Sequence, residues 1–156
     1  MMMTRPGTIR AAALIALTAL LAGCTGPAPA PEATSPPVTP AGLFVVSDAA
    51  RRSMVIDGRG FTVYRFDGDS AEPSRSACVS DCARRWPPVP WSEQLRLVGI
   101  DRQLVGRLDR PDGMQQLTLA GSPLYGYSGD RMPGDVSGSG FGEAWWCVGP
   151  RGARLS

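Results

Sequence analysis

Cysteines, aspartates and tyrosines carry most of the chemistry open to this chain of 156 residues, because it contains no histidine and its 16 basic residues are all arginine. Without histidine there is no imidazole general base, no Ser-His or Cys-His nucleophile pair and no histidine ligand for zinc or haem. Without lysine there is no amine for Schiff-base chemistry. The remaining carboxylates and thiols form no catalytic set, so we expect a protein that is not an enzyme.

Aspartates near two similar turns are the first candidates for a site: Asp67, Asp69, Asp130 and Asp135. Aspartates at turns usually accept hydrogen bonds from free backbone N–H groups, and we expect this role for Asp69 and Asp130. The alternative is that the four carboxylates bind a hard cation such as Ca²⁺, although their spacing does not match an EF-hand loop. Asp109 with Asp112 could act as acid and base, but turn caps are the commoner use of such pairs. No metal site is therefore predicted.

The N-terminal residues have the pattern of a secretory signal followed by a lipid-attachment site. Two arginines precede an apolar stretch, residues 11–22, that is shorter than the roughly 20 residues of a membrane-spanning helix. The block Leu21-Ala22-Gly23-Cys24 resembles the lipobox of bacterial lipoproteins, in which the chain is cut before the cysteine and its sulfur receives a diacylglyceryl group. We therefore predict a signal peptide over residues 1–23, diacylglycerol and palmitate at Cys24, and a cell-membrane anchor on the extracytoplasmic face of a bacterium.

Residues 24–42 are predicted to be a tether, because six prolines lie among small residues and no core can form there. Cleavage of the signal also removes Arg5 and Arg10, which leaves 14 arginines against 14 acidic residues. A net charge of zero with the two signs interspersed does not suit a nucleic-acid-binding protein. We expect the membrane as a partner, through the lipid anchor, and an envelope protein or the cell wall as a second partner of a monomeric chain.

Three cysteines remain once Cys24 is lipidated, and an oxidising compartment favours one disulfide among Cys78, Cys82 and Cys147. Closing the long loop to Cys147 would constrain the unfolded chain by about 4.4 kcal/mol, against about 2 kcal/mol for the short loop. This difference measures stability and not which sulfurs lie close together, so it leaves a bridge to Cys147 open. The alternative uses of these sulfurs are a redox-active pair and a soft Cu(I) site that adds Met114 and Met132.

The elements that must position these residues are predicted to be short β-strands separated by glycine, proline and Asp-Gly turns. Strands are predicted at residues 43–47, 53–56, 61–66, 95–100, 104–108 and 116–120. Two of the turns, residues 57–60 and 111–113, have the composition of hairpin turns. One short helix is expected within residues 78–86, where Pro87 and Pro88 would end it. The fold class is therefore predicted as mainly β, with α+β as the alternative.

A motif of the form Tyr-x-aromatic-x-Gly-Asp occurs at residues 64–69 and again at residues 125–130. Its distinctive residues are Tyr64, Phe66 and Asp69 in the first copy and Tyr125, Tyr127 and Asp130 in the second. Tryptophan follows each copy, as Trp86 and as Trp145-Trp146. In a strand, the tyrosine and the aromatic two positions later face the same side. The duplication predicts two β units packed with pseudo-twofold symmetry in one domain, residues 43–156.

Together these features resemble a family of secreted-repeat lipoproteins that carry a Tyr-x-(Phe/Trp/Tyr)-x-x-Asp motif and have no known function. The resemblance runs from about Val45 to Pro150 and includes the Cys-x-x-x-Cys segment that leads into Trp86-Pro87-Pro88. It implies a disulfide between Cys78 and Cys82, and it supplies no catalytic residue.

The predicted function is that of a lipid-anchored cell-envelope protein with a binding or structural role. The alternative is an extracytoplasmic electron-transfer or copper-handling lipoprotein that uses Cys78, Cys82 and Cys147. Cys147 departs from the family pattern, in which a small or apolar residue is expected at this position.

Overall fold

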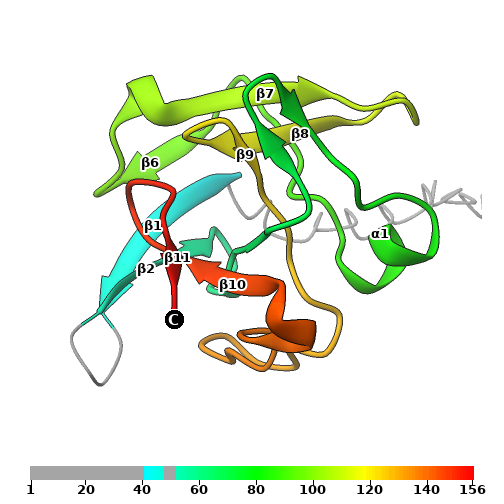
Figure 1. Ribbon diagram of the computed structural model, residues 1–156. Helices are drawn as coiled ribbons and strands as arrows, with labels where there is room; N and C mark the ends of the chain where they lie inside the picture. Colours follow the sequence, from blue (N-terminus) through cyan, green and yellow to red (C-terminus); the bar gives the residue numbers. More distant parts are fainter. Residues whose placement is uncertain (1–40, 48–51) are drawn as a thin grey trace, which may run out of the picture. The chain divides into compact units, whose positions relative to one another are not determined.

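Short β-strands and tight turns form the folded part of the chain, which confirms the mainly β prediction (Figure 1). The computed structural model describes residues 41–47 and 52–156, so the predicted signal peptide, Cys24 and nearly all of the tether lie outside the described residues. All described residues belong to one compact unit, as the single-domain prediction requires. Within them, no helix is long and apolar enough to cross a membrane.

The described residues form three small sheets and one two-stranded ribbon. In the first sheet, of order β2-β1-β6, β1 (Gly42–Ser47) pairs antiparallel with β2 (Ser53–Asp57) and parallel with β6 (Arg96–Val98). The second sheet, of order β11-β10-β3, joins β11 (Arg154–Leu155), β10 (Trp145–Val148) and β3 (Tyr64–Phe66). The third sheet, of order β7-β8-β9, joins β7 (Val105–Asp109), β8 (Gln115–Leu119) and β9 (Ser122–Pro123). The ribbon consists of β4 (Ser70–Ala71) and β5 (Ser74–Arg75).

Aspartate side chains fix both predicted hairpin turns. In the turn after β2, Asp57 Oδ1 accepts the N–H groups of Arg59 at 2.8 Å and of Phe61 at 3.0 Å. The chain then returns beside β2 through a single bridge, Ile56 to Thr62, and not as a full ladder. Between β7 and β8, Asp112 Oδ1 accepts the N–H of Met114 at 3.0 Å, and the two strands pair along their whole length. The second hairpin is therefore complete, whereas the first closes only at its turn.

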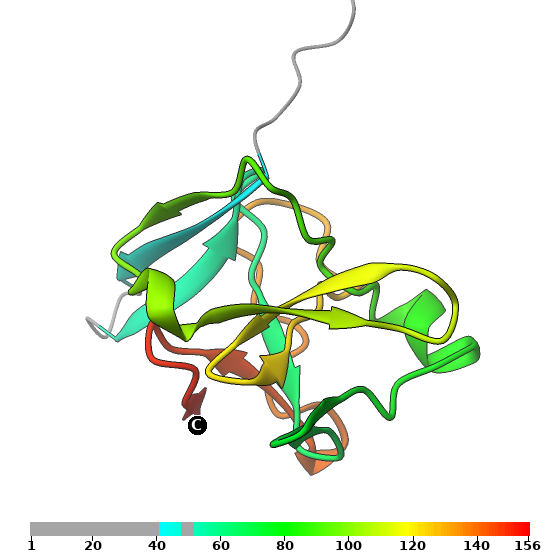
Figure 2. The same cartoon turned by 90° about the horizontal axis from the view of Figure 1, so that it is seen from above.

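Among the described residues the one α-helix, α1 (Asp81–Arg85), lies within the predicted range and ends before Pro87. Two 3-10 turns, η1 (Arg102–Leu104) and η2 (Phe141–Glu143), connect strands. Seen from above, the β7–β8 hairpin extends toward α1 at one end of the molecule (Figure 2). A hydrogen bond of 2.8 Å from Arg110 Nη2 to the carbonyl of Cys78 ties the hairpin to the segment before the helix.

Two hydrophobic clusters share the interior. The aliphatic cluster comprises Leu43, Val55, Val63, Leu95, Leu117, Leu119, Leu124 and Val148. The aromatic cluster comprises Met54, Tyr64, Cys78, Trp86, Tyr125, Trp145 and Cys147. Because side chains alternate across a strand, β2 contributes Val55 to the first cluster and Met54 to the second. The alternation of side chains along β2 therefore lets this strand contribute to both hydrophobic clusters.

The sequence pattern does not predict β10, although β10 is the central strand of its sheet. Three of its four residues, Trp145, Cys147 and Val148, are buried, so the strand has apolar side chains on both faces and no alternation. The predicted strand at residues 61–66 is also shorter than expected, because the chain leaves β2 after Thr62 and pairs with β10 from Tyr64.

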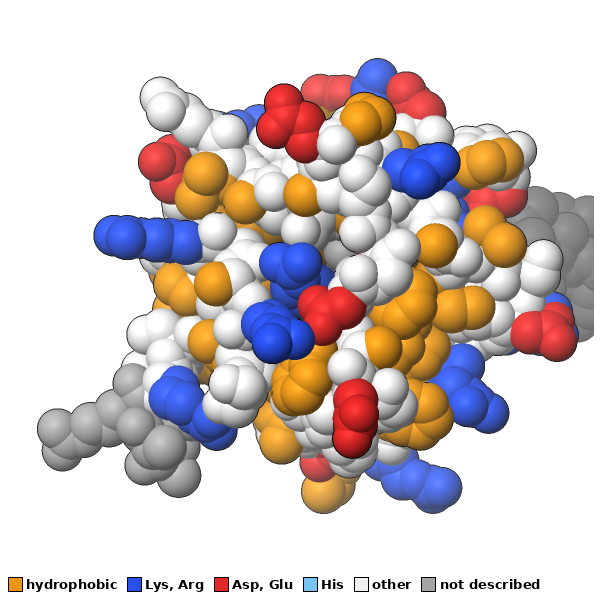
Figure 3. Space-filling view, viewed as in Figure 1, with side chains coloured by type: hydrophobic (Ala, Val, Ile, Leu, Met, Phe, Trp, Pro, Cys, Tyr) orange, Lys and Arg blue, Asp and Glu red, His pale blue; other side chains and the backbone are white. Residues whose placement is uncertain are grey.

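Acidic and basic side chains are scattered over the face drawn in Figure 3, with apolar side chains between them. On this face no large patch of one charge is present. The distribution agrees with the interspersed charges of the sequence.

Candidate functional site

The two copies of the motif meet at their tyrosines. The N–H of Tyr64 donates to the carbonyl of Tyr125 at 2.8 Å, and the N–H of Tyr125 donates to the carbonyl of Tyr64 at 2.9 Å. Equivalent residues of the two units therefore form an antiparallel pair, and a local twofold axis passes between them. This is the pseudo-twofold packing that the duplication predicts.

Each tyrosine side chain crosses to the aspartate of the other unit. Tyr64 Oη donates to Asp130 Oδ2 at 2.7 Å, and Tyr125 Oη donates to Asp69 Oδ2 at 2.6 Å. Both tyrosines are completely buried, so water cannot substitute for either hydrogen bond. We call these two pairs the Tyr–Asp clasps. They join the units through the residues that define the motif.

The second oxygen of each clasp aspartate caps a loop further along the chain. Asp69 Oδ1 accepts the N–H of Ala77 at 2.8 Å, and Asp130 Oδ1 accepts the N–H of Ser137 at 3.0 Å. The sequence predicts that each aspartate accepts N–H groups of the turn within its own motif. In the structure those turns close by backbone hydrogen bonds, from Asp69 N–H to Phe66 and from Asp130 N–H to Tyr127, and the carboxylates are free to reach beyond them.

The glycine of each motif makes room for an aromatic ring. A Cβ at Gly68 would lie 2.5 Å from the Phe66 ring, and a Cβ at Gly129 would lie 2.4 Å from the Tyr127 ring. Distances this short are not found for real Cβ atoms. The glycine therefore lets the ring fold back over its own turn, in the same way in both units.

Four rings, two from each unit, form one continuous stack. Trp86 and Trp145 lie parallel at its centre, with ring centroids 3.8 Å apart and an interplanar angle of 3°. Phe66 stacks on Trp145 at 4.4 Å, and Tyr127 stacks on Trp86 at 4.3 Å. The two units alternate along the stack. Trp145, and not Trp146, is thus the counterpart of Trp86.

The two clasps differ in the charges around them. On the Asp69 side, Arg110 donates to Ser76 Oγ at 2.8 Å, and that hydroxyl lies 2.7 Å from the hydroxyl of Tyr125. Burial raises the pKa of the Asp69 carboxyl, while Tyr125, the N–H of Ala77, Arg110 and Arg65 act to lower it. Burial also raises the pKa of Asp130, and its charged neighbour, Asp135, raises it further. Among the described ion pairs, none includes Asp130.

Burial also controls the tyrosine hydroxyls. It raises the pKa values of Tyr64 and Tyr125 far above the ordinary range, and the hydrogen bond to an aspartate raises each of them further. Both phenols therefore remain protonated and act as hydrogen-bond donors. They cannot serve as bases near neutral pH.

A disulfide joins Cys78 and Cys82, as the family resemblance implies, with Cα atoms 5.2 Å apart. Cys147 is a buried free thiol in β10, and burial raises its pKa. A copper site built from all three sulfurs would need Cys78 and Cys82 as thiolates, and here they are bonded to each other. The other proposed copper ligands, Met114 and Met132, are exposed.

The candidate calcium ligands are not brought together. Asp67 Oδ2 accepts from Trp146 Nε1 and from Arg154 Nη1, both at 2.8 Å. Asp135 Oδ2 accepts the N–H groups of Arg131 and Met132, which lower its pKa. Over residues 41–47 and 52–156 no group of three or more cysteine or acidic side chains is placed to hold a metal ion. Each of the four aspartates instead accepts hydrogen bonds from a different set of side-chain and backbone donors.

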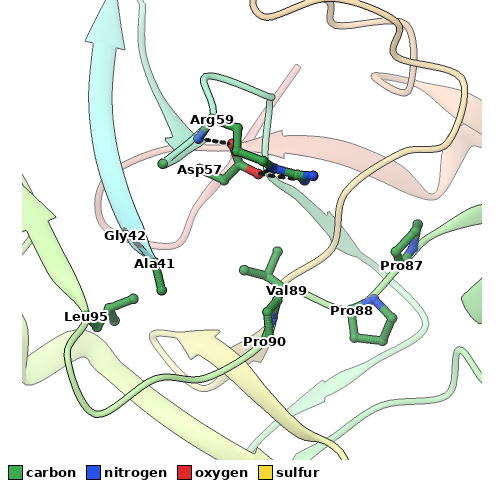
Figure 4. Close-up of a pocket in the computed structure, with 10 residues that line it drawn as sticks. Ala41, Gly42, Asp57, Arg59, Pro87, Pro88, Val89, Pro90 and Leu95 are labelled. Atoms are coloured by element: carbon green, nitrogen blue, oxygen red, sulfur yellow. Dashed lines mark hydrogen bonds and ion pairs between the residues drawn. The ribbon is translucent and has the colours of Figure 1, made fainter. Parts of the chain in front are cut away.

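The sequence does not predict a groove that lies beside the second clasp. It consists of two hollows, of about 400 Å³ and about 290 Å³, whose shared wall is Asp57, Arg59 and residues 87–90. We call it the proline groove. Figure 4 shows the larger hollow, with Pro87, Pro88 and Pro90 facing the Asp57–Arg59 ion pair. Its sequence signal is the run Trp-Pro-Pro-Val-Pro, in which Pro87 and Pro88 by themselves predict only the end of a helix.

Comparison with known proteins agrees with this division into two units. A family model described as a secreted repeat of unknown function matches residues 47–90 and residues 106–148. Each matched segment contains one tyrosine, one aspartate and one tryptophan of the paired motifs. No match was found among curated proteins or among solved structures.

Proposed function

The chain belongs to the family of secreted repeats of unknown function, and from this premise we propose that it is a lipid-anchored protein that binds a partner in the bacterial cell envelope and catalyses no reaction. Membership of a secreted family supports a location outside the cytoplasm. Attachment through Cys24 rests on the sequence of the lipobox, and binding rests on the groove.

The binding role rests on the groove, because the motif residues are occupied in holding the two units together. Tyr64 and Tyr125 are buried donors in the clasps, and Trp86 and Trp145 are buried in the ring stack. Side chains used in this way cannot also act on a substrate. The exposed feature that the fold builds next to them is the proline groove, since Pro87 and Pro90 are exposed on its wall.

Photo-crosslinking in intact cells tests the binding role. A photoreactive residue in place of Pro87, on the groove, should give a defined adduct with an envelope component. The same residue in place of Arg107, which is exposed on β7 away from the groove lining, should not. Equal adducts from both positions, or none from Pro87, would contradict the proposal.

Membrane fractionation tests the anchor separately. Cys24→Ala should move the protein from the membrane fraction to the soluble extracytoplasmic fraction, because the lipid would no longer be attached. Cys147→Ala removes a different cysteine and should leave the protein in the membrane fraction. If Cys24→Ala also remained there, the lipid anchor would be wrong.

A further inference from the structure

Asp130 is a buried carboxylate that takes part in none of the described ion pairs. Its counterpart across the local twofold axis, Asp69, has Arg110 and Arg65 close enough to lower its pKa. Asp130 is only 8% exposed, and the charge that acts on it most is that of another carboxylate, Asp135. Two arginines thus act on the aspartate of the first motif, whereas another carboxylate acts on the aspartate of the second. A buried charge without compensation is costly unless a partner supplies the opposite charge.

Asp130 lines the smaller hollow of the proline groove. This hollow, of about 290 Å³, is walled by Phe61, Val63, Tyr127 and the prolines of residues 87–90. Its other charged residues, Asp57 and Arg59, form an ion pair with each other at 3.0 Å. Arg59 also lies over the Phe61 ring, at 5.3 Å from its centroid. The lining therefore carries one net negative charge, that of Asp130, beside both apolar and polar side chains.

We propose that this end of the proline groove binds an alkylammonium group, such as the side chain of a lysine or of another diamino acid. The ammonium interacts with Asp130, and the methylene stem lies against Phe61 and Pro88. This inference rests on the proposed function in one respect, namely that the groove is a binding surface.

The hydrogen bonds already made by Asp130 favour an ammonium over other cations. Oδ2 accepts from Tyr64 Oη, Oδ1 accepts from the N–H of Ser137, and the Ser137 side chain also bonds to this carboxylate. These three hydrogen bonds leave part of the accepting capacity of the carboxylate free. An ammonium is a compact donor that one oxygen can satisfy, whereas a guanidinium fork needs both oxygens on one open side. A divalent metal needs several oxygen ligands, and a single carboxylate lines this hollow beside the paired Asp57.

Titration of the purified full chain with a matched pair of small molecules tests the proposal. Nα-acetyl-lysine methylamide carries the ammonium, and Nα-acetyl-norleucine methylamide has a similar apolar stem without it. Calorimetry, with tryptophan fluorescence as a second signal from the Trp86–Tyr127 stack, should show the lysine compound binding at least about tenfold more tightly. Equal binding of the two compounds, or no binding of the lysine compound, would overturn it.

Two variants separate the site from the fold. Asp130→Asn should weaken binding of the lysine compound by about tenfold or more. Asp69→Asn is the matched control, because it alters the other clasp and should change the affinity less than about twofold. Ser128→Phe places a ring in the hollow from an exposed position and should also abolish binding while both clasps stay intact. If Asp69→Asn weakened binding as much as Asp130→Asn, or if Ser128→Phe had no effect, the site would be wrong. None of these outcomes depends on the fractionation of Cys24→Ala, so the anchor and the ligand are tested separately.

Discussion

Replacing Tyr64 by phenylalanine should destabilise the fold through Asp130, a residue of the other unit. The substitution keeps the ring and removes only the hydroxyl that donates to Asp130 Oδ2 at 2.7 Å. The same hydroxyl also accepts the N–H of Gly138 at 3.3 Å, so two buried groups lose a partner. A hydrogen bond to a charged group is worth about 1.5 to 3 kcal/mol, and the buried setting favours the upper end. We expect a loss of about 3 kcal/mol for Tyr64→Phe.

A double-mutant cycle measures the contact itself. Urea unfolding of Tyr64→Phe, Asp130→Asn and the double variant should give a coupling energy of about 2 kcal/mol between the two side chains. The companion cycle of Tyr64→Phe with Asp69→Asn uses the aspartate of the same motif, which Tyr64 does not contact. Its coupling energy should be below about 0.5 kcal/mol. A coupling energy between Tyr64 and Asp69, together with none between Tyr64 and Asp130, would refute the crossed arrangement of the clasps.

Three further predictions concern a turn, a carboxylate and a thiol. Gly121→Ala should destabilise the fold by about 3 kcal/mol or more in urea unfolding, because φ is +77° and the new Cβ would lie 2.3 Å from the carbonyl oxygen of Ala71. Gly113→Ala has a similar φ, +82°, in open space and should cost only about 1 kcal/mol. The pKa of Asp130 is raised in the folded chain, so protonation of this carboxyl in acid stabilises the fold, and that stabilisation is lost as the pH rises through the folded pKa. Asp130→Asn should therefore lose more stability in thermal unfolding at acidic pH than at neutral pH. Alkylation of Cys147 by iodoacetamide at neutral pH, followed by mass spectrometry, should be slow in the folded chain and fast in urea, since burial raises the pKa of the thiol.

Each of these predictions has a clear opposite outcome. Equal losses for the two glycine variants would show that the contact with Ala71 is not tight. A penalty for Asp130→Asn that grows toward neutral pH would mean that the charged form is the one the fold stabilises. Rapid alkylation of folded Cys147 would place the thiol in an open position.

The sequence predicts those parts of the fold that depend on local patterns. Turn residues give the two Asp-capped turns, alternation gives most of the strands, and Pro87-Pro88 gives the end of the helix. The repeat gives the two units, because equal spacing of aromatic residues is visible without any structure. The turns, the strands and the end of the helix are each encoded within a few neighbouring residues.

Features that depend on contacts between distant residues are not predicted. The motif spacing fits a tyrosine that bonds the aspartate of its own unit as well as one that bonds the other unit, and only the fold decides between them. A buried arginine such as Arg110 looks like any surface arginine in the sequence, since its partners Ser76 and Cys78 lie more than 30 residues earlier in the chain. The proline groove likewise forms where residues 57–59 meet residues 87–90.

The crossed arrangement of the clasps also bears on how two copies of this chain would interact. Every clasp joins a first unit to a second unit, and its geometry is the same whether the two units belong to one molecule or to two. The covalent connection keeps both units of one chain at a high effective concentration, which favours closure within the molecule in dilute solution. The exchange of units between two chains would therefore use these same contacts.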